Sequence, residues 1–399
     1  MVQSPVYWLW LAAASMLVWL VPVTLRASFL AVAGFGYLAS VDIPLACLVA
    51  VWSLLFFAAG RLDPATQGPQ RKRLLRLLIG LSLLQLVWFK LWLTGSAGNA
   101  VGAAGATGGK EHWILPLGVS YFTFKFIHYA LEMSRRTLKP HSWADFASYM
   151  ALPPIFTAGP IERFDHFLAN RASQWSPQLF AEGATRIVHG LVKKFVIAAM
   201  LEPSGDSIAS QSQLLEMLPD IPTIRVWRYL FRTFLLFYLD FSAYSDVAIG
   251  GARLLGVGIQ ENFDWPILAP NIGAFWKRWH MTLAGWCQSY IYMPLIGKTR
   301  NPYVATYLAF LGIGLWHGPT LGWLLWGAWH GTGVAAYVYW TQLKKRRRWV
   351  VPANIATRVL STGLTLAFVS TASVLPAVRN VQDLFGVLRI LAKMVFVDV

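Results

Sequence analysis

The stretch VYWLWLAAASMLVWLVPVTL, residues 6–25, is twenty residues long and carries no charge. Because about 20 residues of helix cross the apolar core of a bilayer, this stretch predicts a membrane-spanning helix. Residues 45–59, 74–93 and 321–340 form further long apolar runs. Backbone amides find no partner in lipid, and these runs lack the alternation of barrel strands. The sequence therefore predicts an all-α polytopic membrane protein.

The composition agrees with this fold class. The chain has 399 residues, of which 56% are hydrophobic and only 13% charged, whereas about a quarter of the residues in soluble domains are charged. No solenoid-like repeat or internal boundary is visible, so we expect one membrane domain over residues 1–399. Its length has room for roughly ten to twelve spanning helices, with re-entrant or interfacial helices in addition. The first span lacks a basic flank and a small-residue cleavage site, so we expect it to be retained.

The basic residues are grouped at the ends of apolar runs. Although the net charge is +16, this placement indicates membrane orientation rather than nucleic-acid binding. The three clusters comprise Arg61 with Arg71, Lys72, Arg73 and Arg76, then Arg135, Arg136 and Lys139, and finally the run from Lys344 to Arg348. We assign all three clusters to the cytoplasm, which places the N-terminus outside. Residues 94–109 would then lie outside, and residues 113–131 would return to the cytoplasm.

Three apolar segments are interrupted by Pro and Gly. They are residues 151–164, 260–295 and 312–319. Irregular backbone at membrane depth survives only inside protein or beside a watery cavity. We expect re-entrant or surface-lying helices in the first two, and an interfacial location for the polar stretch 163–186.

Three histidines stand in apolar, aromatic surroundings late in the chain: His280, His317 and His330. Imidazole can accept a hydroxyl proton near neutral pH, although a polar residue in a membrane can equally serve a helix-helix hydrogen bond. His317 and His330 are each preceded by Trp and followed by Gly, which predicts room for a substrate beside the ring. No short spacing of metal ligands is present, so we expect no metal site. Cys47 and Cys287 lie in apolar surroundings and do not predict a disulfide framework.

Two further polar groups lie in the segment 225–253. Asp240 and Asp246 need partners in an apolar stretch, and we expect pairing with Arg253, Lys277 or Arg278; a proton relay is the alternative. Arg225, Arg228 and Arg232 form a basic stripe. The stripe either binds phosphate groups of lipids or of a cytoplasmic donor, or consists of solvated and lipid-contacting arginines.

Four motifs occur in order along the chain: PPIFTAGPIERF, YLDFSAYSDVAIG, ENFDWPILAPNIGAFWKRWHMTL and GLWHGPTLGWLLWGAWHG. With them the chain resembles the membrane-bound O-acyltransferase family, most closely its bacterial polysaccharide-modifying members of the alginate O-acetylase and teichoic acid D-alanyl transferase type. One departure is the stretch WCQSYIY, at 286–292, where these relatives carry an Arg-Asp pair. It leaves open the subfamily and the carrier surface.

The resemblance implies a ring of spanning helices around a central funnel. It places the invariant histidine of the family on His317 and a second polar position on His280, both as catalytic residues. The further residues that we expect to bind substrate or line the channel are Trp316, His330, Trp276, Arg278, Trp279, Tyr290, Asp240, Asp246 and Asn262.

The resemblance also implies the reaction. An acyl group, acetyl by default, would pass from a cytoplasmic thioester donor to a hydroxyl of a cell-surface or periplasmic polysaccharide. The donor would be acetyl-CoA or an acyl carrier protein, and no tightly bound cofactor is expected. The expected location is a bacterial inner membrane, with an extracytoplasmic acyl-handling partner. Alternatives are D-alanyl or other acyl transfer to a different envelope polymer, a covalent acyl-enzyme, and a transporter or export subunit without enzymatic activity.

Overall fold

A computed structural model describes residues 4–395 except 63–64, 66, 101–117, 157, 204–207, 351 and 353; of residues 92–100 it describes the backbone only. All regular elements in these residues are helices, and Arg171 and Val257 form an isolated β-bridge. The predicted all-α fold is confirmed. The chain divides into two compact units: residues 1–191 with 243–261, called the first unit, and residues 192–242 with 262–399, called the second unit. The expectation of a single domain stays a prediction.

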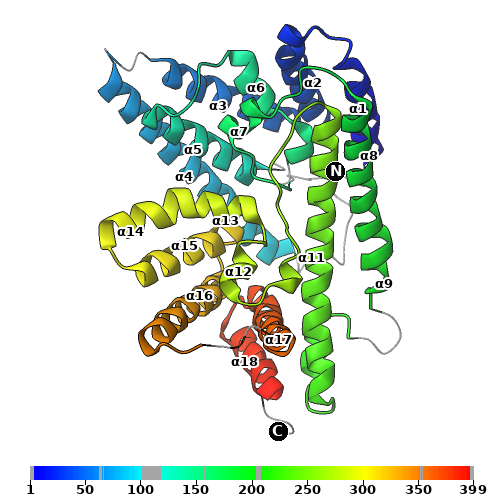
Figure 1. Cartoon of the computed structure of the whole chain (residues 1–399), viewed down its shortest axis with the longest axis vertical. Coiled ribbons are helices and arrows are strands. Elements are labelled where there is room, and N and C mark those ends of the chain that lie inside the picture. Colours follow the sequence, from blue (N-terminus) through cyan, green and yellow to red (C-terminus); the bar gives the residue numbers. More distant parts are fainter. Residues whose placement is uncertain are drawn as a thin grey trace. The chain divides into compact units, whose positions relative to one another are not determined.

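The first unit contains the N-terminal helices (Figure 1). Its elements are α1 (Pro5–Leu17), η1 (Val23–Leu25), α2 (Arg26–Val41), α3 (Ile43–Arg61), α4 (Gly68–Ala100), α5 (Val119–Arg135), α6 (Trp143–Met150), η2 (Pro153–Ile155), α7 (Phe164–Ala169) and α8 (Pro177–Val192). The C-terminal part of α11 (Thr223–Leu254) joins them. Gly183 and Gly190 of α8 pack against α11, where an added Cβ at Gly190 would lie 2.6 Å from the carbonyl oxygen of Ala243. Small residues thus allow these helices to cross closely.

Four helical segments in the described part of the chain are long and apolar enough to cross a membrane: Val23–Val41, Ile43–Arg61, Gly68–Leu91 and Ile355–Ala377. The predicted apolar run at 45–59 lies within the second of them, and residues 74–91 of the predicted run at 74–93 lie within the third. This agrees with a multi-pass membrane protein, whereas the expected number of ten to twelve spans stays a prediction. The outward segment 94–109 is helical to Ala100. The rest of that segment and the start of the predicted return at 113–131 lie outside the described residues.

The prediction of one spanning helix over residues 6–25 is wrong. Helix α1 ends at Leu17 and is 13 residues long, about 20 Å at the rise of an α-helix, which is shorter than the core of a bilayer. The chain then turns, and Pro22 precedes the short helix η1. The residue before a proline disfavours helical backbone, so Pro22 keeps Val21 from extending a helix. The sequence correctly indicated an apolar segment, but the end of the helix at Leu17 was not predicted.

In the described residues of the interrupted segment 151–164, η2 is a helix of three residues, and α7 begins at Phe164. Much of it is buried, and at its end the carboxylate of Glu162 is fully buried, accepting hydrogen bonds from the Nδ1 of His166 at 2.6 Å and the backbone N–H of Gln260 at 2.7 Å. Irregular backbone is thus enclosed by protein, as its Pro and Gly content predicts. Whether it re-enters the membrane stays a prediction.

The contact between His166 and Glu162 predicts a pH-dependent stability. The hydrogen bond to Glu162 raises the pKa of His166, while partial burial opposes the shift. Because the pKa in the folded protein exceeds the unfolded value, this stabilisation is complete below about pH 6.5 and is lost as pH rises through the raised pKa. His166→Gln should therefore lower the thermal midpoint of detergent-solubilised protein more at about pH 5.5 than at about pH 9.

A matched control for this measurement is His189→Gln, at an exposed histidine of α8. Its effect on the midpoint should be the same at both pH values. An equal loss of stability for His166→Gln at both pH values would rule out the protonated pair.

The second unit carries the C-terminal helices and the first part of α11. Its other elements are η3 (Lys193–Ile197), α9 (Ala198–Met200), α10 (Gln211–Met217), η4 (Pro266–Leu268), α12 (Ile272–Trp276), α13 (Met281–Cys287), η5 (Gln288–Tyr292), α14 (Met293–Thr299), α15 (Pro302–His317), α16 (Leu321–Arg347), α17 (Ile355–Thr371), η6 (Ala372–Ala377) and α18 (Val381–Val395). The second interrupted segment, 260–295, is thus a chain of short helices.

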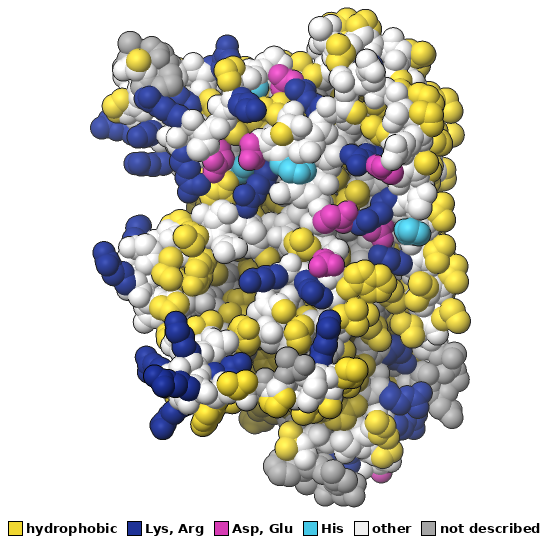
Figure 2. All heavy atoms as spheres, viewed as in Figure 1, with side chains coloured by type: hydrophobic (Ala, Val, Ile, Leu, Met, Phe, Trp, Pro, Cys, Tyr) yellow, Lys and Arg dark blue, Asp and Glu magenta, His cyan; other side chains and the backbone are white. Residues whose placement is uncertain are grey.

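Helices α15 and α16 form a tight pair in the second unit. Asn301 caps the start of α15 and Thr320 that of α16, each accepting backbone hydrogen bonds through its side chain. Glycines lie where the two helices meet: a Cβ added at Gly314 would lie 2.3 Å from the carbonyl oxygen of Trp323. The run from Lys344 to Arg348 stands at the end of α16, where Figure 2 shows a group of basic side chains. Its cytoplasmic assignment stays a prediction.

Candidate active site

A cavity of about 290 Å³ in the second unit is lined by all three candidate histidines, and we call it the histidine cavity. Its wall is formed by side chains from α11, from the segment 275–283, and from the end of α15. Side chains from α16, α17 and η6 complete it. The other lining residues are Thr233, Phe234, Phe237, Phe241, Phe275, Trp276, Trp279, Leu283, Trp323, Trp326, Val369, Ser373 and Pro376. Imidazoles therefore share one small chamber with a largely aromatic wall, which is typical of ligand pockets with few polar groups.

His317 is the last residue of α15 and is half-buried. Its ring stacks on the indole of Trp323, with centroids 4.5 Å apart and planes 18° apart, and meets Trp326 edge-on at 5.4 Å. A protonated imidazole on the face of an indole gains cation–π attraction. The face of Trp323 thus offers a positively charged His317 ring a favourable contact.

The glycines after His317 and His330 have a different role from the one predicted. A Cβ added at Gly318 would lie 2.6 Å from the Trp323 ring, and one added at Gly331 would lie 3.1 Å from the ring of Tyr307. The space beside each glycine is therefore occupied by an aromatic side chain. The glycines thus admit the packing of α15 against α16, and the space beside the two imidazole rings is the histidine cavity.

His280 is held in a fixed orientation. It is 2% exposed and has a left-handed backbone, with φ of 43°, directly before α13. Its Nδ1 lies 2.9 Å from the Oδ1 of Asn262, which also accepts a hydrogen bond from the hydroxyl of Thr282 at 2.8 Å. Because this oxygen can only accept, Nδ1 carries the proton and Nε2 presents a lone pair.

His330 lies on α16 and is 3% exposed. It packs against Trp326 at 4.4 Å and meets Trp276 edge-on at 5.2 Å. Three buried nitrogen atoms of cavity residues have no hydrogen-bond partner among the described residues: His280 Nε2, His330 Nδ1 and Trp276 Nε1. Buried polar atoms are normally paired, so these atoms indicate a polar ligand in the histidine cavity.

One wall of the histidine cavity was missed by sequence reasoning. Phe234, Phe237 and Phe241 project from α11 into it, and the ring of Phe241 meets that of His280 edge-on at 4.8 Å. Their spacing at i, i+3 and i+7 places them on one helical face. That spacing was the available signal, but it does not say what the face adjoins.

The tryptophan candidates lie at or near the histidine cavity. Trp276 and Trp279 line it. The ring of Trp316 does not line the cavity but lies 4.6 Å from that of His317 and 6.4 Å from that of His280. These tryptophans therefore determine the shape of the site.

Arg278 and Tyr290 do not line the histidine cavity. The guanidinium Nε of Arg278 lies 3.9 Å from a carboxylate oxygen of Asp264, and the ring of Tyr290 packs on Trp286 at 5.1 Å. The short helices turn these two side chains away from this cavity, and their role in binding substrate or lining the channel stays a prediction.

The two aspartates have other partners than those predicted. Asp240 pairs with Lys194 in the second unit. Asp246 belongs to the first unit and lies 2.7 Å from Arg186, while Arg253 pairs with Glu182 at 2.9 Å. The choice of partners was therefore wrong, because Lys194 and Arg186 come from a segment far earlier in the chain, but pairing as the role of both carboxylates is consistent with the structure.

Within the described ranges, no group of three or more His, Cys, Asp or Glu residues could hold a metal ion. Cys47 and Cys287 are free thiols. The imidazoles that line the histidine cavity can accept and donate protons.

Comparison with known proteins identifies the family to which the chain belongs. The model of the membrane-bound O-acyltransferase family matches residues 35–373. The chain is 36% identical over 229 residues to the probable alginate O-acetylase of Pseudomonas aeruginosa. The matched residues cover 56% of this chain and 43% of the relative. It is 27% identical over 271 residues to the teichoic acid D-alanyltransferase of Bacillus subtilis, covering 63% and 66%.

A third relative is the peptidoglycan O-acetyltransferase of Helicobacter pylori, 27% identical over 310 residues, which cover 70% of this chain and 57% of the relative. The chain spans about half the length of the alginate O-acetylases that it matches.

Proposed function

Since the chain belongs to the membrane-bound O-acyltransferase family, we propose that it transfers an acyl group from a thioester to a hydroxyl within the histidine cavity. The observation that carries this proposal is the pair His317 and His280 on one small cavity, with the Nε2 of His280 buried and without a partner. Such a site can accept hydroxyl protons away from bulk water.

His317 acts as the general base. It removes the hydroxyl proton while the oxygen attacks the thioester carbonyl, an ester C–O bond forms, the C–S bond breaks, and the imidazolium returns the proton to the leaving thiolate. Charging a half-buried imidazole costs less than charging one that is 2% exposed. This difference and the Trp323 ring support His317, rather than His280, as the residue that becomes charged.

His280 positions the acceptor. Its Nε2 accepts a hydrogen bond from a second hydroxyl of the acceptor, so that the reacting hydroxyl faces His317. Asn262 fixes this arrangement, because its Oδ1 holds the proton of His280 on Nδ1. Orientation of this kind lowers the barrier through the entropy of approach.

This role of Asn262 gives a testable prediction. Asn262→Ala removes the acceptor of the His280 Nδ1–H bond and should lower kcat about 10- to 100-fold by disorienting the imidazole. Asn262→Asp keeps an oxygen acceptor and should restore much of the rate, with a pH profile displaced because a carboxylate favours the charged imidazole. A purely structural Asn262 would give two equally impaired variants with unchanged pH profiles.

Direct transfer agrees better with the cavity than a covalent acyl-enzyme. Thr233 and Ser373 are the two side-chain hydroxyls that line it. Each donates a hydrogen bond to a backbone carbonyl of its own helical segment, that of Tyr229 at 2.8 Å and that of Ser370 at 2.7 Å. Neither bond is to a base, which a nucleophilic hydroxyl needs.

We propose the donor, the acceptor and the partner as well. The donor is acetyl-CoA or an acyl carrier protein at the cytoplasmic side of a bacterial inner membrane, and the acceptor is a cell-surface or periplasmic polysaccharide. An extracytoplasmic partner handles the acyl group. The names of the relatives include both O-acetylases and a D-alanyltransferase, so D-alanyl transfer to an envelope polymer is the alternative activity.

Two measurements test this function. Mass spectrometry of the cell-surface polymer, with and without the protein, should show loss of acetyl esters; loss of alanyl esters would establish the alternative. Purified protein in nanodiscs should release free thiol from an acyl thioester only when an acceptor polymer is present. Surface polymers of unchanged composition and no thiol release would leave a transporter or export subunit as the function.

A further inference from the structure

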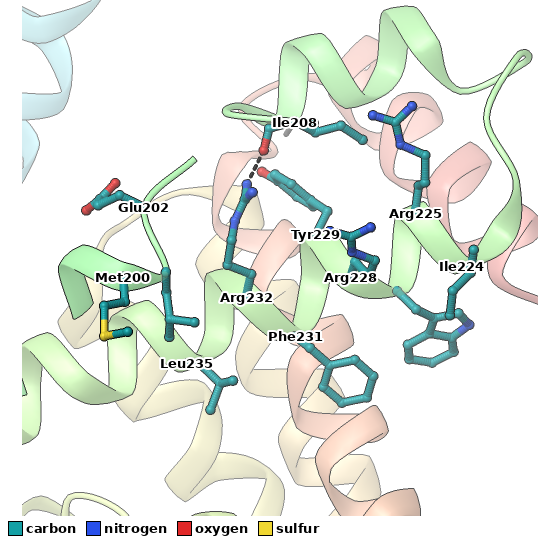
Figure 3. A pocket seen from close by; sticks show the side chains of 12 residues that line it. Met200, Glu202, Ile208, Ile224, Arg225, Arg228, Tyr229, Phe231, Arg232 and Leu235 are labelled. Atoms are coloured by element: carbon teal, nitrogen blue, oxygen red, sulfur yellow. Dashed lines mark hydrogen bonds between the residues drawn. The ribbon is translucent and has the colours of Figure 1, made fainter. Parts of the chain in front are cut away.

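A second cavity, of about 890 Å³, lies beside the first part of α11 in the second unit. Residues at the end of α9 and just after it line one side, and α11 residues 224–235 line the other (Figure 3). It shares no lining residue with the histidine cavity. We call it the arginine cavity, and its size is that of a small-ligand site.

Three arginines of α11 line the arginine cavity: Arg225, Arg228 and Arg232. Their spacing at i, i+3 and i+7 places them on one face, and Figure 3 shows Arg225 and Arg232 extending from the same side of the helix. Arg228 is exposed, and in the described part of the chain neither it nor Arg232 forms an ion pair with a carboxylate. The cavity therefore presents positive charge that the protein itself does not neutralise.

Arg232 is the more enclosed of these two arginines. One terminal nitrogen donates to the carbonyl oxygen of Ile208, and the guanidinium lies 5.8 Å from the centroid of the Tyr229 ring. Its Nε is buried and has no hydrogen-bond partner among the described residues. A guanidinium held in this way is oriented for an oxygen acceptor, and phosphate oxygens match its geometry.

Most of the other residues that line the arginine cavity are apolar. Figure 3 shows Phe231 and Leu235 on the other side of α11 from Arg232. Met200 and Ile224 also line the cavity, and they are 80% and 63% exposed. In a membrane protein, exposed apolar side chains of this kind contact lipid chains.

We propose that the arginine cavity binds an anionic phospholipid, with its phosphate between Arg228 and Arg232 and its acyl chains along Met200, Ile224 and Leu235. The arginines alone would suit any phosphate ester, including one on a soluble donor, but a soluble ligand does not need the apolar half. Glu202 also lines the cavity, and Figure 3 shows it at the end away from Arg225. Arg228 and Arg232 against one carboxylate leave the site positive, which selects anionic over zwitterionic headgroups.

Native mass spectrometry of the full chain in detergent tests this site. Titration with phosphatidylglycerol should show binding of one lipid molecule. Phosphatidylcholine at the same concentration should bind to a smaller extent. Arg228→Gln should weaken that site about fivefold, and the double variant Arg228→Gln with Arg232→Gln about 30-fold, at about 1 kcal/mol for each arginine near a membrane surface. Arg228 carries the test because it holds no structural contact, whereas Arg232 also supports Ile208.

The matched control is Arg358→Gln, which removes one exposed arginine from α17 outside the arginine cavity. It should retain the wild-type affinity for phosphatidylglycerol. Equal binding of phosphatidylcholine, or unchanged affinity in Arg228→Gln, would overturn the proposal. Displacement of phosphatidylglycerol by inorganic phosphate or coenzyme A would assign the site to a soluble phosphate ligand, which overturns it as well.

Discussion

Replacement of His317 with alanine should lower the rate of acyl transfer by about 10²- to 10⁴-fold, the usual contribution of a well-placed general base. The loss should fall on kcat, because the imidazole is proposed to act on the reacting proton rather than on ground-state binding. Thiol release from an acyl thioester, measured on protein in nanodiscs with an acceptor polymer present, gives this rate. Size-exclusion profile and thermal midpoint should stay close to wild type, since His317 is a half-buried residue at a helix end.

Two variants make this experiment specific. His189→Ala removes an exposed imidazole on α8 and should leave the rate unchanged. His280→Ala should lower kcat at least as much as Asn262→Ala does, because His280 is proposed to orient the acceptor. Full activity of His317→Ala would remove His317 from the mechanism. If instead His280→Ala abolished transfer while His317→Ala kept it, the roles of the two imidazoles would be exchanged.

The positions of the three histidines on one cavity agree with an expectation based on local sequence. His280, His317 and His330 were singled out because ionisable groups are costly in apolar surroundings, and that reasoning needs no tertiary information. The same holds for the interrupted segments, since Pro and Gly break a helix wherever it lies. Sequence was sufficient where the cause is local.

Features that depend on neighbours distant in the chain could not be predicted in this way. The partner of Asp246 is Arg186, sixty positions earlier, and no spacing rule connects them. The glycine after His317 was expected to leave space for a substrate, yet the space holds the ring of Trp323. Whether a small residue leaves a gap or allows a close contact is decided by the helix packed against it.

The close contact between α15 and α16 predicts the second large effect, a loss of both stability and activity when Gly327 is replaced. A Cβ added at Gly327 would lie 2.6 Å from the carbonyl oxygen of Phe310 and 3.2 Å from the Cα of Leu311. Both are backbone atoms, so α15 and α16 must move apart to admit even a methyl group. Gly327→Ala should therefore destabilise the protein by about 1–3 kcal/mol, as other overpacking substitutions do, and it should also lower activity.

The loss of activity follows from what the two helices carry. Phe310 of α15 packs edge-on against Trp276, with ring centroids 4.9 Å apart, and stacks near His330 of α16 at 6.3 Å. Separation of the helices therefore displaces cavity residues from both sides, and displacements of about 1 Å can cost about 100-fold in rate. Thermal unfolding in detergent and thiol release measure the two effects.

Two control variants separate the effect of helix packing from the effect of replacing a glycine with alanine. At Gly312, also on α15, a Cβ would make an ordinary contact of 3.5 Å with Ile291, and at Gly363 on α17 nothing lies within 4 Å. Gly312→Ala and Gly363→Ala should match or exceed wild-type stability, because alanine favours helix over glycine. If Gly327→Ala were as stable and as active as these two variants, the close approach of α15 and α16 would not be what holds the histidine cavity together.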